Sequence, residues 1–166
     1  MSELNLAYFG GIIILVVLIG AILVPRLMAR RWKQHERLTV DVWKKEGISF
    51  RRGPVGGKLA GVESRSGLRQ QMSIGYLAMT EKDLRLTRLH PFGVWIITYR
   101  QIKGIELKKT FIGNRAKTVP FVIVRFVQDG QADKIGFQVN DFEAWANDLA
   151  EAANVKVKDG VNDNGD

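Results

Sequence analysis

The side chains of this sequence that could take part in catalysis or metal binding are few and scattered. The histidines are His35, in a basic stretch, and His90, in a turn; no carboxylate lies at a spacing that would complete a metal site with either. Glu81 and Asp83 flank a predicted turn and are expected to be solvated, whereas general acid catalysis needs a carboxyl whose surroundings shift its proton affinity. The chain has no cysteine, so disulfides and thiolate metal sites are excluded. We therefore expect no enzyme, no cofactor and no metal.

Basic side chains offer a second kind of chemistry, the binding of anionic groups. The chain has 25 Lys and Arg against 17 Asp and Glu, a net charge of +8. Two predicted loops, 58–69 and 108–117, carry the candidate residues for contact with lipid headgroups or a partner: Lys58, Arg65, Arg69, Lys108, Lys109, Arg115 and Lys117. The alternative interpretation is that these two loops are only exposed to solvent, because solvated loops are also rich in Lys and Arg. Nucleic acid is not expected, because the sequence shows neither a recognition helix nor an RNA-binding aromatic strand.

The N-terminal stretch 4–25 dominates the organisation of the chain. Its 22 residues, LNLAYFGGIIILVVLIGAILVP, include no ionisable side chain. As a helix it would be about 33 Å long, enough to cross a hydrocarbon core of about 30 Å. A cleaved signal peptide fits poorly, because Glu3 precedes the run and no small-residue cleavage site follows it. The sequence predicts a single transmembrane helix within residues 1–25.

The residues that flank this helix predict its orientation. The membrane-flanking set lies entirely after the helix and consists of Arg26, Arg30, Arg31, Trp32, Lys33 and Arg37. Because Lys and Arg near a membrane stay on the cytoplasmic side, the N-terminus is expected outside and the remainder inside. Residues 26–46 are expected to form a basic juxtamembrane helix or linker. The predicted location is the plasma (inner) membrane, with a cytoplasmic C-terminal domain.

Short strands dominate the sequence after Gly47. Alternating or continuous apolar runs predict strands at 48–52, 75–80, 84–89, 94–99, 102–109, 119–127 and 135–139. The glycine-rich segment 53–57 lacks the Lys-Ser/Thr of a phosphate-binding loop, so we interpret it as a hairpin turn. Asn140 is the predicted N-cap of one amphipathic helix, with Glu143 completing a capping box.

This final helix has an apolar stripe and ends before a polar tail. The stripe consists of Phe142, Trp145, Ala146, Leu149 and Ala153. Asn154 is the expected C-cap, and residues 154–166 are expected to be a disordered tail.

The order of these elements resembles a pleckstrin-homology-like (PH-like) domain of the bacterial or GRAM-like sort. The resembling segments are GYLAMTEKDLRL, QIKGIEL, FVIVRF and DFEAWANDLAEA, within residues 47–153. The resemblance implies a mainly β fold, a small barrel capped by the C-terminal helix, with Trp145 packed into the barrel mouth. Lys58, Arg65 and Arg69 depart from the family's basic phosphoinositide motif in spacing.

Two classes of function stay open. In the first, the protein is a membrane-anchored accessory or assembly protein that docks a larger membrane-protein complex or a cytosolic protein. In the second, the basic loops bind anionic lipid headgroups at the membrane. We favour the protein partner, because a transmembrane helix already localises the domain and a lipid-binding loop would add little to targeting.

The predicted orientation is testable because the chain lacks cysteine. Single cysteines placed at Ser2 and at Asn162 should react differently with a membrane-impermeant thiol reagent in intact cells. We expect labelling at position 2 and none at position 162 until the membrane is permeabilised. The reverse pattern would mean that the C-terminal domain lies outside.

Overall fold

A computed structural model describes residues 17–27, 29–30, 33–34, 37–65, 72–89 and 92–161. The chain divides into two compact units, Met1–Val42 and Trp43–Asp166. The predicted domain 47–153 lies within the second unit. Each unit is described by itself below.

The described part of the first unit is helical. Residues 17–27 form a helix, and the π-helical segment η1 spans Arg37–Asp41. Large apolar side chains are exposed along the first helix: Val17, Leu18, Ile19, Ile22, Leu23, Val24 and Leu27. None of the helices among the described residues is both long and apolar enough to cross a membrane. Most of the predicted span 4–25 lies in residues 1–16, outside the described residues.

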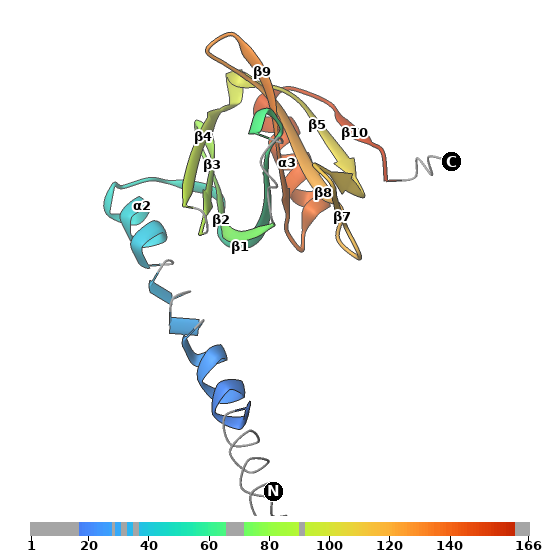
Figure 1. Ribbon diagram of the computed structural model, residues 1–166. Helices are drawn as coiled ribbons and strands as arrows, with labels where there is room; N and C mark the ends of the chain where they lie inside the picture. Colours follow the sequence, from blue (N-terminus) through green and yellow to red (C-terminus); the bar gives the residue numbers. More distant parts are fainter. Residues whose placement is uncertain are drawn as a thin grey trace, which may run out of the picture. The chain divides into compact units, whose positions relative to one another are not determined.

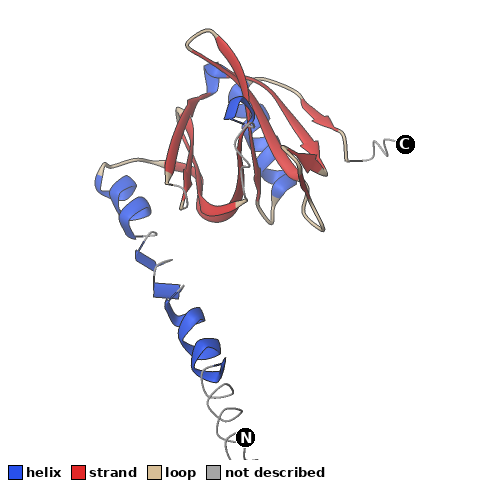
Figure 2. Cartoon of the chain, in the orientation of Figure 1, coloured by secondary structure: helices blue, strands red, loops and turns tan. Residues whose placement is uncertain are grey.

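The second unit is mainly β, as predicted, with one C-terminal helix (Figures 1 and 2). The short helix α2 (Val42–Lys45) starts at the last residue of the first unit and continues into the second. The strands are β1 (Phe50–Val62), β2 (Ser73–Thr80), β3 (Asp83–Arg88), β4 (Gly93–Thr98), β5 (Ile102–Lys108), β6 (Thr110–Phe111), β7 (Asn114–Arg115), β8 (Phe121–Gln128), β9 (Gln131–Gln138) and β10 (Val157–Asp159). Two 3-10 turns, η2 (Glu63–Arg65) and η3 (Tyr99–Gln101), and helix α3 (Phe142–Ala153) complete it.

Eight of these strands form one open sheet. Their order is β10-β5-β8-β9-β1-β2-β3-β4, and β6 pairs with β7 in a separate hairpin. All neighbours are antiparallel except β10 and β5, which are parallel. The sheet has two edges, β4 and β10. It is therefore open, whereas the resemblance implies a barrel. The turn predicted between Glu81 and Asp83 is confirmed in the β2–β3 hairpin, and β8 and β9 form a second antiparallel hairpin.

Strand β1 corrects the predicted hairpin at residues 53–57. It runs unbroken for 13 residues, pairing with β2 along its first part and with β9 along its last. The turn-forming residues produce irregularities within the strand: the register with β2 shifts between Phe50 and Val55, and Gly53 has a φ of 83°. Glycine signals a bulge as readily as a turn, which is why the sequence pattern misled.

Helix α3 packs against β5 and β8 and covers the inner face of the sheet (Figure 2). Trp145 is 1% exposed and meets Phe137 of β9 edge-on, with ring centroids 6.1 Å apart. The predicted burial of Trp145 is confirmed. The N-cap is Asp141 without a side-chain cap hydrogen bond, so the predicted capping box at Asn140 is wrong. Asn154 is the C-cap in the left-handed conformation, as expected.

The polar tail is more ordered than predicted. Residues Val157–Asp159 form β10, which lies alongside β5 and is followed by a hydrogen bond from Gly160 N to Leu107 O. Val155, Val157 and Val161 pack against the core. These three valines are spaced among polar residues, so the overall composition of the tail did not indicate that it packs against the domain. Residues 162–166 lie outside the described part of the chain.

Trp145 provides a direct test of this core. We expect Trp145→Ala to lower the free energy of unfolding by about 3–5 kcal/mol, because it leaves a cavity between α3 and β9. Urea unfolding of the full chain in mild detergent, followed by near-ultraviolet circular dichroism, measures the loss. Gln131→Ala at the exposed β8–β9 turn is the control and should change little. An unchanged midpoint for Trp145→Ala would contradict the packing.

Candidate interaction surfaces

Four of the seven predicted binding residues come together around the β6–β7 hairpin. Lys108, Lys109, Arg115 and Lys117 are all exposed within ten residues of chain. The hairpin turns at Gly113, with a φ of 71°, and is closed by a 2.7 Å hydrogen bond from Ala116 N to Lys109 O. We call these four residues the basic hairpin.

Aromatic packing fixes the basic hairpin to the outer face of the sheet. Phe111 is buried against Phe121, with ring centroids 6.3 Å apart, and both belong to a small cluster with Ala60 and Ile123. The Phe111 ring lies directly over Gly136 of β9, where a side chain would displace it. The hairpin therefore presents its cations from a rigid base.

The cations of the hairpin differ in their partners. Lys108 pairs with Glu106 at 3.0 Å, and Arg125 pairs with the same carboxylate at 3.3 Å. Burial opposes the ionisation of Glu106, but Lys108 and Arg125 outweigh it and lower the pKa of that carboxyl. No ion pair joins Lys109, Arg115 or Lys117 to the described residues, so these three cations face solvent.

The structure does not bring the other predicted residues to this hairpin. Lys58 is exposed on β1 opposite Ile74 of β2, and Arg65 ends η2. Arg69 lies outside the described residues. Of the membrane-flanking set, Arg26, Arg30, Lys33 and Arg37 are exposed on the helical first unit, whereas Arg31 and Trp32 are not described.

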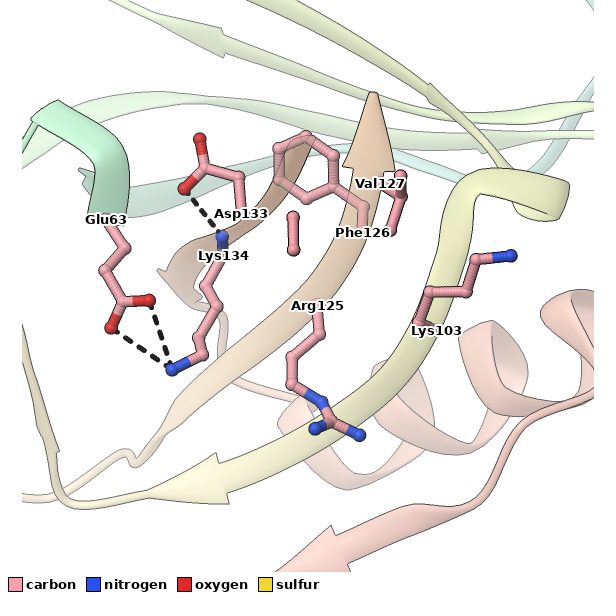
Figure 3. A pocket seen from close by; sticks show the side chains of 8 residues that line it. Glu63, Lys103, Arg125, Phe126, Val127, Asp133 and Lys134 are labelled. Atoms are coloured by element: carbon pink, nitrogen blue, oxygen red, sulfur yellow. Dashed lines mark hydrogen bonds and ion pairs between the residues drawn. The ribbon is translucent and has the colours of Figure 1, made fainter. Parts of the chain in front are cut away.

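A shallow depression of about 260 Å³ lies beside β8 and β9 (Figure 3). Its charged lining residues are largely engaged with one another or with main-chain groups: Lys134 pairs with Glu63 at 3.1 Å, and Ser64 donates to Asp133. Lys103 Nζ donates to the Arg100 carbonyl. Because acids and bases alternate here, the depression has no single preferred sign of charge.

The sequence did not predict the most unusual surface of the domain, which lies on and beside edge strand β4. Three large apolar side chains are exposed there, Phe92 by 70%, Val94 by 48% and Ile96 by 48%. We call Phe92, Val94 and Ile96 the β4 surface. Strand β4 reads GVWIIT and carries no charge, and its register with β3 runs from Gly93 to Thr98 without a bulge.

The two faces of β4 have different roles. Trp95 and Ile97 point to the inner face, opposite Leu86 and Leu84 of β3, and belong to the core. Val94 and Ile96 therefore point to the outer face. The sequence signal for this surface was the uninterrupted apolar run VWIITY. In a strand that is covered on its inner face only, such a run leaves every second apolar side chain exposed on the outer face.

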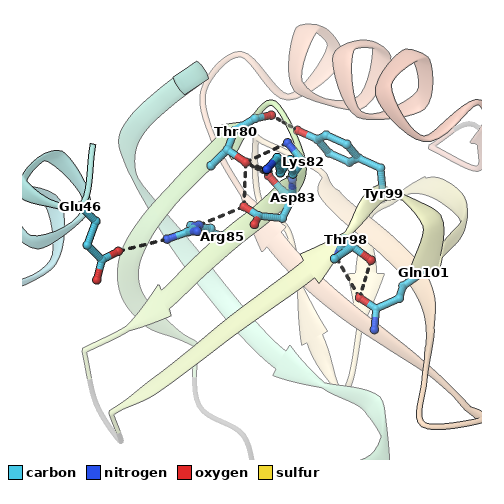
Figure 4. Close-up of polar contacts among 8 residues, drawn as sticks. All are labelled: Glu46, Thr80, Lys82, Asp83, Arg85, Thr98, Tyr99 and Gln101. Atoms are coloured by element: carbon cyan, nitrogen blue, oxygen red, sulfur yellow. Dashed lines mark hydrogen bonds and ion pairs between the residues drawn. The ribbon is translucent and has the colours of Figure 1, made fainter. Parts of the chain in front are cut away.

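The end of β4 is held by a polar network (Figure 4). Asp83 is buried, so its predicted solvation is wrong: it accepts hydrogen bonds from Thr80 Oγ1 at 2.8 Å and Arg85 Nε at 3.0 Å. Arg85 also faces Glu46 at 3.6 Å. Directly after β4, the Tyr99 hydroxyl donates to the Thr80 carbonyl at 2.6 Å, and burial raises the pKa of Tyr99 to about 12. Because Tyr99 stays protonated at neutral pH, its hydroxyl can donate this hydrogen bond, which ties the end of β4 to β2.

The described residues contain no group of three or more His, Cys, Asp or Glu side chains arranged to hold a metal ion. The domain thus offers two surfaces of opposite chemistry, the basic hairpin and the β4 surface. Comparison with known proteins adds no assignment: no protein-family model matches the chain, and no curated protein matches its sequence.

Proposed function

We propose that this protein is a membrane-anchored, non-enzymatic interaction module that docks a partner protein at the cytoplasmic face of the membrane. The anchor is the apolar stretch 4–25. Its support is the sequence itself, together with the exposed apolar side chains of residues 17–27 and the exposed basic residues that follow. An exposed apolar helix needs an apolar environment, which the bilayer supplies.

We further propose that the domain is a variant of the PH-like fold. The support is a run of antiparallel strands followed by a helix whose tryptophan is buried against the sheet. The addition of β10 after that helix extends the sheet by one parallel strand. Because a fold of this kind hosts many activities, it carries no function by itself.

The observation that carries the docking function is the β4 surface. Edge strands of monomeric proteins are protected by charges, prolines or bulges, and β4 has none of these. Fully burying an exposed Val or Ile side chain contributes about 1.5–3 kcal/mol. Val94 and Ile96 are each 48% exposed, so a partner that covered them would gain about half of this amount for each side chain. A protein that covered both would gain apolar burial and main-chain hydrogen bonds together.

The basic hairpin favours a second candidate function, contact with anionic lipid headgroups. Lys109, Arg115 and Lys117 lie on one rigid projection without acidic partners among the described residues. Each would contribute about 1 kcal/mol near an anionic leaflet, a contribution that falls with salt. The two functions are compatible, because the β4 surface and the hairpin lie on different parts of the sheet.

Site-specific photo-crosslinking tests both candidates in the full chain. A photoreactive amino acid at Ile96 should yield a discrete protein adduct in living cells, because β4 is covered there. The same amino acid at Gln131, an exposed position away from both surfaces, is the control and should yield none. Placed at Thr118, beside the hairpin cations, it should yield lipid adducts where headgroups are contacted.

The identity of the Ile96 adduct, determined by mass spectrometry, decides the function. A reproducible protein adduct at Ile96 that is absent at Gln131 supports docking. Adducts at Thr118 alone, and only with lipid, would replace docking with headgroup binding as the main function. No adduct of any kind at Ile96 would contradict a covered β4.

A further inference from the structure

We infer that the protein covering β4 is a second copy of this chain, joined by antiparallel pairing of β4 with its counterpart. This inference rests on the proposed docking function and names its partner. The pairing places Trp95 of one copy opposite Trp95 of the other, so that one sheet runs through both copies.

The two edges of the described sheet are not equivalent as sites for strand addition. β10 has three residues, two of which are the exposed Lys158 and Asp159, and it pairs in parallel with β5. β4 has six residues in regular register with β3 and no charged side chain. Charged, short edges resist pairing and long, uncharged ones accept it, so an added strand belongs at β4.

A second copy fits this edge because a charge-free strand does not repel itself. The chain has 25 Lys and Arg against 17 Asp and Glu, a net charge of +8, so two copies repel each other on average and a contact between charged surfaces needs matched signs. The basic hairpin is an example, since Lys109, Arg115 and Lys117 form no ion pair with an acidic side chain in the described part of the chain. At β4 this obstacle is absent, and the apolar side chains are complementary to themselves.

The alternation of side chains selects the register. Antiparallel pairing keeps outer face beside outer face only when residues of the same face lie opposite each other. With Trp95 opposite its counterpart, Val94 of each copy lies opposite Ile96 of the other, and five residues of each strand are paired, Gly93 to Ile97. Moving the centre to Ile96 would instead set Val94 against Thr98. The Trp95 register therefore covers both exposed apolar residues of both copies.

On the inner face of β4, the position of Trp95 would also allow an aromatic pair between the two copies. The Trp95 ring leans over Gly93, where a side chain would collide with it, and the Arg88 guanidinium lies 5.5 Å from the ring centroid. Trp95 is held in place yet half-buried. Two such rings on adjacent strands form a cross-strand aromatic contact, among the favourable pairs in antiparallel sheets.

Cysteine crosslinking of the full chain in mild detergent tests this register. Opposed residues in antiparallel strands have Cα atoms about 4.5–5.5 Å apart, within disulfide range, whereas diagonal neighbours are about 7–8 Å apart. A mixture of Val94→Cys and Ile96→Cys proteins should therefore form disulfide-linked dimers under mild oxidation. Each variant alone should form them more slowly, and Val94→Cys mixed with Gln131→Cys should form none.

Sedimentation of the same chain provides the second measurement. The unmodified protein should sediment as two chains of 18.7 kDa each. Ile96→Asp brings unpaired carboxylates into the shared apolar face and should abolish the dimer, whereas Gln131→Asp should leave it intact. Circular dichroism of Ile96→Asp shows whether the exposed substitution leaves the fold unchanged; if it does not, the cysteine mixture decides alone.

The outcomes separate this inference from the function on which it rests. Dimers that survive Ile96→Asp, or cysteine mixtures that do not exceed the single variants, overturn the β4 pairing. If the photo-crosslink at Ile96 then identifies a different protein, docking at β4 stands and the second copy is excluded. If Ile96 crosslinks to nothing, both proposals fail together.

Discussion

The domain depends on one bent strand. β1 pairs with β2 along its first part and with β9 along its last, so it joins β2–β3–β4 to β9–β8–β5–β10 in a single sheet. The bend demands close packing: a side chain at Gly57 would collide with Leu77 and with the Gln138 carbonyl, and Gly61 has a φ of 109°. Because of this bend both halves of the sheet turn their apolar faces toward α3. Arg51 ties β1 to the helix through Glu151 at 2.8 Å.

This arrangement also determines where the two candidate surfaces lie. The half that ends in β4 has a covered inner face and an outer face on which Val94 and Ile96 stay exposed. The other half carries the β6–β7 hairpin, held on its outer face by Phe111 over Gly136. A strand that ends a sheet has unpaired main-chain groups, and a hairpin that projects from one carries charges into solvent. The chemistry of each surface thus follows from its place in the sheet.

Much of the domain could be predicted from periodicity, and the failures share a physical cause. Alternating Leu84 and Leu86 and the stripe around Trp145 located β3 and α3, since both patterns report the burial of one face. The glycines at 53–57 were misread because a strand irregularity and a hairpin turn use the same residues. β10 was missed because its apolar contacts come from isolated valines in a polar tail. The edge position of β4 depends on the order of the strands in space, which no local pattern encodes.

The central claim is that β4 is covered by protein at the membrane, and hydrogen exchange measures it most directly. Every second amide of an edge strand points away from its neighbour and exchanges freely unless another strand or surface covers it. Among the Gly93–Thr98 amides, we predict slower exchange of those that point away from β3 for the full chain in its native membrane than for the same chain highly diluted in detergent. Strand β10 serves as the internal reference and should exchange equally in both. Equal exchange of β4 in membrane and in dilute detergent would contradict the docking of any protein at this edge.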